Sequence, residues 1–192
     1  MDEISSVILC GGRSQRMGRD KARLIWNGRE LLDDIAGRLS ALGEVLLSAD
    51  RKTRFAGKPW PIVEDQYPDC GPLGGVCSAL LACKTPLLFV VSCDMPFITW
   101  ETGGMLRDCL GRNDAAVPVE FDGRVHPLCA VYRKDAAPVL LRQLQTGNFR
   151  MRDALSRLQA AYVPAGDLPG GSRSLCNVNT PEEYRKVSRL KC

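Results

Sequence analysis

The sequence contains one histidine and 6% aromatic residues, and no apolar run approaches the roughly 20 residues that a helix needs to cross a bilayer. A single histidine leaves no evident Ser-His-Asp or Cys-His set, which disfavours nucleophilic catalysis of that kind. No aromatic residues interleave the basic cluster as a stacking surface for nucleic acid would require, and the net charge of +4 is small. We therefore expect neither a membrane span nor a nucleic-acid partner.

Zinc and disulfide frameworks are also disfavoured, although the chain has nine cysteines. Their number is odd, and no two of them have C-x-x-C spacing. The acidic start "MDEISSVILCGG" lacks the build of a secretory signal, so we expect a cytoplasmic protein whose cysteines are mostly buried hydrophobes or free thiols. The 192 residues, 45% of them hydrophobic, fit one domain over 1–192.

Apolar stretches of strand length alternate with stretches of helical spacing. Strands are predicted over 4–10, 21–26, 44–49, 86–94, 115–119 and 125–132, and helices over 29–42, 71–83, 99–110, 134–146, 149–159 and from Pro181 onward. The alternation predicts an α/β fold with a mostly parallel central sheet between two helical layers. Ligands of such folds bind beyond the carboxyl ends of the strands. The candidate site segments are therefore residue 10 onward, 48–51, 64–75 and 92–96, and residues 164–174 are predicted to form a loop.

The first of these segments, "ILCGGRSQRMGRDKARL" at 8–24, combines glycines with basic side chains directly after a predicted strand. Glycine lets backbone N–H groups approach a phosphate, because no Cβ blocks the way. The segment is neither a Walker loop, since Arg19 and Asp20 follow Gly18, nor a G-x-G-x-x-G fingerprint. It can surround a triphosphate with Arg13, Arg16 and Lys21, whereas Arg19 and Arg23 are expected to be surface charges. A solvated surface loop is the alternative.

The pattern G-G-R-S-x-R-M-G-x-D-K closely resembles the signature of the molybdenum cofactor guanylyltransferase family, nucleotidyltransferases with a Rossmann-like fold. The resemblance covers nearly the whole chain, through "VED" at 63–65, "GPLGG" at 71–75, "SCDMPF" at 92–97, "HPLCAVYR" at 126–133 and "NVNTPEEY" at 177–184. It implies a three-layer sandwich of the nucleotide-diphospho-sugar transferase type. It also implies transfer of GMP from GTP to molybdopterin, or to its molybdenum-bearing form, with release of pyrophosphate.

The same resemblance implies roles for individual residues and for partners. Lys21, Arg16 and Asp94 would be catalytic, and Asp94 would also bind Mg²⁺. Nucleotide-binding positions would be Leu9, Cys10, Gly11, Gly12, Arg13, Lys21, Asp65, Gly71, Pro72, Leu73 and Asp94. Acceptor-binding positions would be His126, Arg150, Asn177 and Asn179. Partners would include GTP, the pterin acceptor, and cofactor-insertion proteins or molybdoenzyme chaperones.

The chemistry of this transfer explains the scarcity of histidine. The attacking group is already an anionic phosphate, so the reaction requires no general base. His126 is then a positioning residue, with a plain strand-end histidine as the alternative. Asp65 could accept hydrogen bonds from N1 and N2 of guanine together. Cytosine-using relatives tend to carry an alanine in the first loop and to lack the G-P-L turn, so GTP is favoured over CTP.

Each site residue also has a purely structural interpretation. Asp94 could open a turn before a proline, the glycines at 71–75 could serve close packing, and Arg150 could be a solvated helix charge. Thr180, Pro181 and Glu183 could form a helix start with a capping box. Two positions depart from the family, Cys10 in place of the usual alanine and Asp50 where asparagine is frequent.

Three other functions remain open. The first is a nucleotidyltransferase that uses CTP or a sugar-phosphate acceptor, and the second is a non-catalytic nucleotide or pterin carrier. The third is a phosphate-binding surface that docks nucleic acid or another protein. Lys21 and Asp94 together argue against the carrier.

Overall fold

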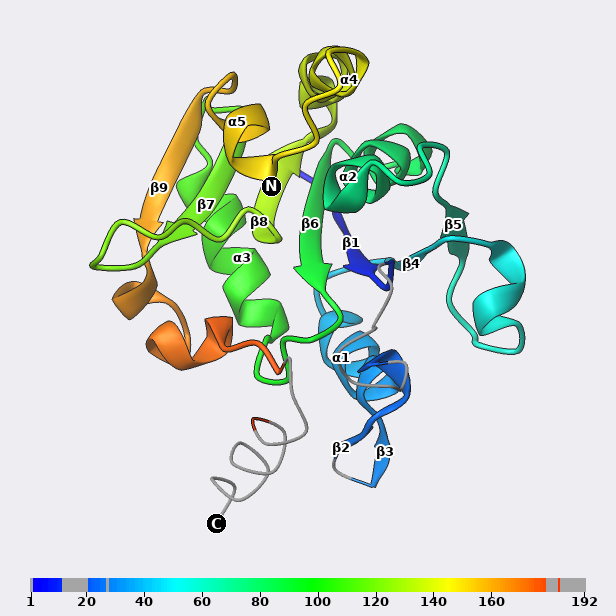
Figure 1. Cartoon of the computed structure of the whole chain (residues 1–192). Helices are drawn as coiled ribbons and strands as arrows, with labels where there is room; N and C mark the ends of the chain where they lie inside the picture. The colour runs from blue at the N-terminus through cyan, green and yellow to red at the C-terminus, as the bar shows by residue number, and fades with distance from the viewer. Residues whose placement is uncertain (1, 12–20, 27, 179–182, 184–192) are drawn as a thin grey trace.

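The structure, a computed structural model, describes residues 2–11, 21–26, 28–178 and 183. A seven-stranded sheet in the order β5-β4-β1-β6-β8-β7-β9 forms its centre (Figure 1). The strands are β1 Ile4–Leu9, β4 Val45–Ala49, β5 Ile62–Glu64, β6 Leu87–Ser92, β7 Ala115–Val119, β8 Cys129–Arg133 and β9 Ala160–Pro164. β8 is antiparallel to both of its neighbours, and every other pairing in this sheet is parallel. The mostly parallel sheet expected from the sequence is confirmed.

The sequence of β6 shows why these strands are buried on both faces. Leu87, Phe89 and Val91 contribute to the core on one side of the sheet. Leu88 and Val90 contribute to the core on the other side. Alternate side chains of a strand point to opposite faces, so a strand between two helical layers needs an almost continuous apolar sequence.

The helices cover the two faces in separate groups. α1 (Leu31–Leu39) and α3 (Trp100–Cys109) pack on the face with Phe89, whereas α2 (Gly71–Ala82), α4 (Ala137–Gln145) and α5 (Met151–Leu155) pack on the face with Val90 (Figure 1). A two-stranded hairpin of β2 (Ile25–Trp26) and β3 (Arg29–Glu30) precedes α1. The five helices and the central sheet form the three-layer α/β sandwich expected from the sequence.

One edge of the sheet collects the segments that follow the parallel strands. The Cys10 N–H donates to the Ser48 carbonyl at 2.9 Å, and the Cys93 N–H donates to the Leu9 carbonyl at 3.2 Å. On the other side of β4, the Asp65 N–H donates to the Ala49 carbonyl at 2.9 Å. These bonds continue the sheet beyond the ends of β5, β4, β1 and β6, and they bring the four candidate segments together.

Several predicted elements differ from the structure. β5 and β9 lie where no strand was expected, and the helix expected over 149–159 is only α5 (Met151–Leu155). Two predicted strands are shorter than expected: β8 begins only at Cys129, and the first three residues of 21–26 form a 3₁₀ helix, Lys21–Arg23.

Residues 164–174 contain two 3₁₀ helices, Ala165–Asp167 and Gly171–Leu175. The helix expected from Pro181 lies almost entirely outside the described residues. Among the residues that are described, no helix is long and apolar enough to cross a membrane.

Candidate functional site

Asp94 lies two residues beyond the end of β6 and is 9% exposed. Its backbone carbonyl accepts a hydrogen bond of 2.8 Å from the N–H of Val178. Val178 is buried, whereas the neighbouring Asn177 is exposed. The structure therefore brings Asn177 close to Asp94 from a distant part of the sequence; Asn179 lies outside the described residues.

The loop after Asp94 is fastened to α1 by Arg38. The Arg38 guanidinium donates to the carbonyl of Pro96 at 2.8 Å and to the carbonyl of Ile98, and it pairs with the buried Asp34 at 2.9 Å. Burial lowers the pKa of Arg38, and the attraction of Asp34 opposes this shift. A planar group with several donors can hold two carbonyls and a carboxylate at once. No local pattern in the sequence indicated this role for Arg38.

Phe97 joins the same loop to two other segments of the site. Trp26 packs edge-to-face against the Phe97 ring at a centroid distance of 5.7 Å, and the Arg173 guanidinium lies 4.4 Å from the ring centroid. Trp26 closely follows the 3₁₀ helix that contains Lys21, and Arg173 precedes Asn177. The Phe97 ring, which follows Asp94 in the chain, thus contacts the segments that carry Lys21 and Asn177.

The glycine loop is described only at its two ends. Leu9 and Cys10 are buried, and the Cys10 N–H already donates to Ser48, so Cys10 cannot offer that amide to a nucleotide. Gly11 is the first exposed residue after β1. Gly12, Arg13 and Arg16 lie outside the described residues, while the backbone of Lys21 opens the 3₁₀ helix beside α1.

Asp65 and the start of α2 lie on the other side of the glycine loop. Gly71 has a φ of +62°, which a residue with a side chain rarely adopts, and Pro72 is exposed beside it. Leu73, another predicted nucleotide-binding position, is fully buried, so neither its side chain nor its backbone is exposed for contact with a nucleotide. Pro72 has no N–H, so the amides at this helix start come from its neighbours.

Asp50, the acidic residue at an expected asparagine position, lies among basic side chains. Its carboxylate is 3.4 Å from Nη1 of Arg54 and 3.8 Å from Nε of Arg51. The two guanidinium groups offset part of the negative charge that this substitution introduces near the nucleotide side of the site.

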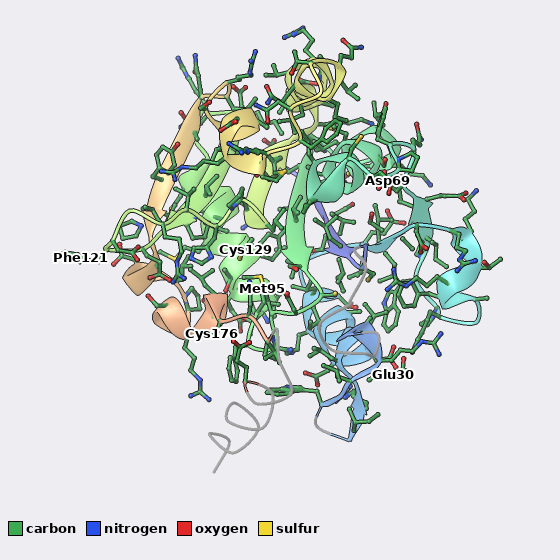
Figure 2. The ribbon with its side chains drawn as sticks, viewed as in Figure 1. Glu30, Asp69, Met95, Phe121, Cys129 and Cys176 are labelled. Atoms are coloured by element: carbon green, nitrogen blue, oxygen red, sulfur yellow. The ribbon has the colours of Figure 1, made fainter. Side chains whose placement is uncertain are left out.

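His126, one of the predicted acceptor-binding residues, lies on the opposite side of Asp94, in the loop between β7 and β8. The Ser92 N–H donates to Leu128 at 3.0 Å, which brings this loop to the end of β6. His126 lies in it, with Nε2 3.3 Å from Oε1 of Glu120. The exposed ring of Phe121 marks the far end of the loop (Figure 2).

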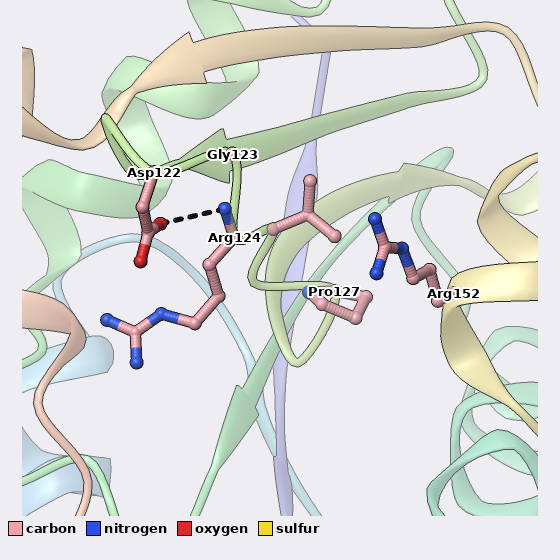
Figure 3. Close-up of a pocket in the computed structure, with 6 residues that line it drawn as sticks. Asp122, Gly123, Arg124, Pro127 and Arg152 are labelled. Atoms are coloured by element: carbon pink, nitrogen blue, oxygen red, sulfur yellow. Dashed lines mark hydrogen bonds between the residues drawn. The ribbon is translucent and has the colours of Figure 1, made fainter.

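A cavity of about 340 Å³ lies between this loop and α5 (Figure 3). Arg124 and Arg152 line it from opposite sides, and the Arg124 N–H donates to Oδ1 of Asp122 at 2.9 Å. Arg150, the predicted position, is exposed at the start of α5, but it is Arg152 that lines the cavity. The sequence motif "RVHP" contained a signal for Arg124, since it places a basic residue two positions before the candidate histidine.

The described residues fit a magnesium ion that arrives with a nucleotide better than a resident metal. They contain no group of three or more His, Cys, Asp or Glu side chains that could hold a metal ion. Asp94 supplies one carboxylate at a strand end. Protein-bound Mg²⁺ commonly uses one or two carboxylates, and takes its other ligands from substrate phosphates and water.

The fold is shared with solved structures of nucleotidyltransferases. Over 97% of both chains, the structure is similar to molybdopterin-guanine dinucleotide biosynthesis protein A from Archaeoglobus fulgidus, with a TM-score of 0.84 and 22% identity. It is also similar to 2-C-methyl-D-erythritol 4-phosphate cytidylyltransferase from Thermus thermophilus, with a TM-score of 0.69 and 19% identity over 96% of this chain and 97% of that one. At these identities, both likenesses concern the fold.

Sequence comparison identifies the family. Residues 6–162 match the model of the MobA-like NTP transferase domain. The chain is 35% identical to a "Probable molybdenum cofactor guanylyltransferase" of Chloroflexus aggregans, over 96% of this chain and 93% of that one. It is 30% identical to the molybdenum cofactor guanylyltransferase of Polynucleobacter asymbioticus, over 96% and 95%. The chain belongs to the molybdenum cofactor guanylyltransferase family of MobA-like NTP transferases.

Proposed function

We propose that this protein transfers GMP from GTP to the terminal phosphate of molybdopterin, or of its molybdenum-bearing form, and releases pyrophosphate. The observation that supports this most directly is the order of groups along one sheet edge. Asp65 follows β5, the glycine loop follows β1, and Asp94 follows β6, with Asn177 and the His126 loop beyond it. In this order, the base would bind at Asp65, the phosphates at the glycine loop and Asp94, and the acceptor beyond Asp94.

In the proposed reaction, an oxygen of the acceptor phosphate attacks the α-phosphorus of GTP. The bond between the α-phosphorus and the oxygen bridging to the β-phosphate breaks, and pyrophosphate leaves with that electron pair. Asp94 would hold Mg²⁺ bound with the nucleotide, which would supply positive charge to the phosphates. Lys21, Arg13 and Arg16 would provide further positive charge, and no residue has to take a proton.

The acceptor would lie on the side of Asp94 away from Asp65. Asn177 is held there by the bond between Val178 and Asp94, and His126 lies in the neighbouring loop. Burial lowers the pKa of His126, so a neutral imidazole is available at neutral pH to position the acceptor through hydrogen bonds.

Product analysis with a nucleotide panel tests the proposal. The purified protein is incubated with molybdopterin, Mg²⁺ and either GTP, CTP or ATP, while pyrophosphate release and the dinucleotide product are measured. We expect rapid turnover with GTP. A strong preference for CTP would contradict the choice of nucleotide, and GTP binding without pyrophosphate release would support a carrier instead.

Asp94→Asn tests the catalytic role within the same assay. Losing the carboxylate that faces the phosphates should lower turnover by roughly 10²–10³-fold while the fold is retained. Asp108→Asn is the matched control, because Asp108 is exposed on α3 and pairs only locally with Arg107 at 3.0 Å. Undiminished turnover of Asp94→Asn at limiting Mg²⁺ would contradict the assignment.

A further inference from the structure

The carboxylate of Asp65 is held by the chain itself through one of its two oxygens. Oδ1 accepts a hydrogen bond of 2.9 Å from the N–H of Tyr67 and one of 3.1 Å from the hydroxyl of Ser78. Within the part of the chain that the structure describes, no hydrogen bond to Oδ2 is seen. The expectation that Asp65 accepts hydrogen bonds from N1 and N2 of guanine therefore points to Oδ2, because Oδ1 already has two donors.

Ser78 is a fully buried residue in α2 that connects this helix to the turn containing Asp65. Its oxygen accepts a hydrogen bond of 2.9 Å from the N–H of Gln66. Its single hydroxyl proton is shared between Oδ1 of Asp65 and the carbonyl of Gly74, which lies 2.9 Å away. The bond to Gly74 is the usual back-bond of a helical serine, whereas the contact with Asp65 links α2 to the turn outside the helix.

Close packing leaves the turn little room to move. A Cβ on Gly74 would lie 2.6 Å from the Tyr67 carbonyl oxygen and 3.2 Å from Oδ1 of Asp65. Glycine at this position thus allows α2 to approach the turn until the Ser78 hydroxyl reaches the carboxylate. This explains one glycine of "GPLGG" by packing, as the structural interpretation of that motif expected.

We propose that Ser78 is a positioning residue for guanine recognition: by holding Oδ1 of Asp65, it directs Oδ2 to accept hydrogen bonds from N1 and N2 of the base. This inference rests on the proposed function, in which Asp65 reads guanine. Ser78 is buried and touches Asp65 rather than the base. Without its hydroxyl the carboxylate would keep one internal donor and could rotate, so base selection would weaken while the contacts to the phosphates remained.

The test compares GTP with inosine triphosphate, which lacks the exocyclic N2 amino group. We measure kcat and KM for both nucleotides, with molybdopterin and saturating Mg²⁺, in the wild-type protein, Ser78→Ala, Asp65→Asn and Ser6→Ala. Ser6 is a fully buried serine in β1, so Ser6→Ala controls for loss of a buried hydroxyl elsewhere. For Ser78→Ala we expect the KM for GTP to rise about tenfold with kcat little changed, as loss of one orienting hydrogen bond predicts.

We also expect Ser78→Ala to reduce the ratio of kcat/KM for GTP to that for inosine triphosphate by about 5–10-fold. Ser6→Ala should leave that ratio unchanged. If Asp65→Asn loses the preference for GTP but Ser78→Ala retains it, the role of Ser78 is overturned and the proposed function stands. If Asp65→Asn retains the preference, base recognition by Asp65 itself is wrong.

Ser78→Cys provides a second variant in case Ser78→Ala does not fold. A cysteine has nearly the volume of serine but is a much weaker donor. We expect a folded protein with a reduced preference for GTP over inosine triphosphate. An unchanged preference in Ser78→Cys, with a melting temperature close to that of the wild type, would overturn the proposal.

Discussion

His126, a predicted acceptor-binding residue, makes the stability of the folded protein depend on pH. Burial lowers its pKa from 6.5, the nearby Arg124 lowers it further, and Glu120 and Asp122 oppose the shift. The unfolded chain therefore binds a proton at a higher pH than the folded protein does. The free energy of unfolding should fall as pH decreases through about 6.5, and this loss should end below the folded-state pKa.

We expect His126→Gln to remove this part of the pH dependence. Urea unfolding of the two proteins between pH 5 and pH 8 would measure the difference. Identical slopes of unfolding free energy against pH would mean that His126 does not titrate differently in the folded state.

At the scale of whole elements, Arg38 makes α1 a support for the loop that carries Asp94. Arg38→Ala would leave the carbonyls of Pro96 and Ile98 without their donor, and would lower the free energy of unfolding by about 2 kcal/mol. The loosened loop should also raise the Mg²⁺ concentration needed for half-maximal turnover. Urea unfolding and a Mg²⁺ titration measure the two effects.

Arg107→Ala is the control for Arg38, because Arg107 pairs with the exposed side chain of its neighbour Asp108. We expect this change to alter stability by less than about 0.5 kcal/mol. Arg38→Lys should restore little, because a lysine cannot reproduce the fork of donors that bonds two carbonyls. A normal Mg²⁺ requirement in Arg38→Ala would contradict the supporting role.

Some of the strands, helices and contacts were predictable from the sequence, and others were not. β6 was predictable because its apolar run is continuous, and α1 because its buried residues recur at helical spacing. β9 was missed because "AAYVP" is short, contains alanines and a proline, and forms a half-exposed edge strand. The contacts of Arg38 span 58 and 60 residues, so no local pattern could reveal them.

The placement of the candidate site residues was predictable only in part. Asp94 ends the predicted strand 86–94, but β5, which precedes Asp65, was not predicted, and Ser78 lies inside an almost uniformly apolar helix. Its role depends on how closely α2 approaches the turn at residues 65–67, which only the packed structure defines.

Across the whole molecule, burial divides the cysteines into reactive and protected groups. Eight are described: Cys109 and Cys176 are exposed, Cys70 is half-buried, and Cys10, Cys77, Cys83, Cys93 and Cys129 are buried. Burial raises the pKa of Cys77 to about 12, which further suppresses its thiolate.

We expect a thiol reagent at pH 7.5 to label Cys109 and Cys176 first among these eight, followed by Cys70. The five buried thiols should react only when the protein unfolds. Peptide mass spectrometry after timed labelling would measure the order. Early labelling of Cys129 in the native protein would mean that the sheet opens locally, contrary to its full burial.

The antiparallel direction of β8 places the loop that would bind the acceptor apart from the strands that would bind the nucleotide. Because β8 runs against β7, the chain leaves the sheet and re-enters it at the same edge, and residues 120–128 form one loop there. The proposed nucleotide side is formed by the segments that follow β5, β4, β1 and β6. The loop at 120–128 joins β7 to β8 instead. If the proposed function holds, we expect a change in the length or charge of this loop to alter the choice of acceptor more than the use of GTP, which makes the loop the natural place to graft a new acceptor specificity.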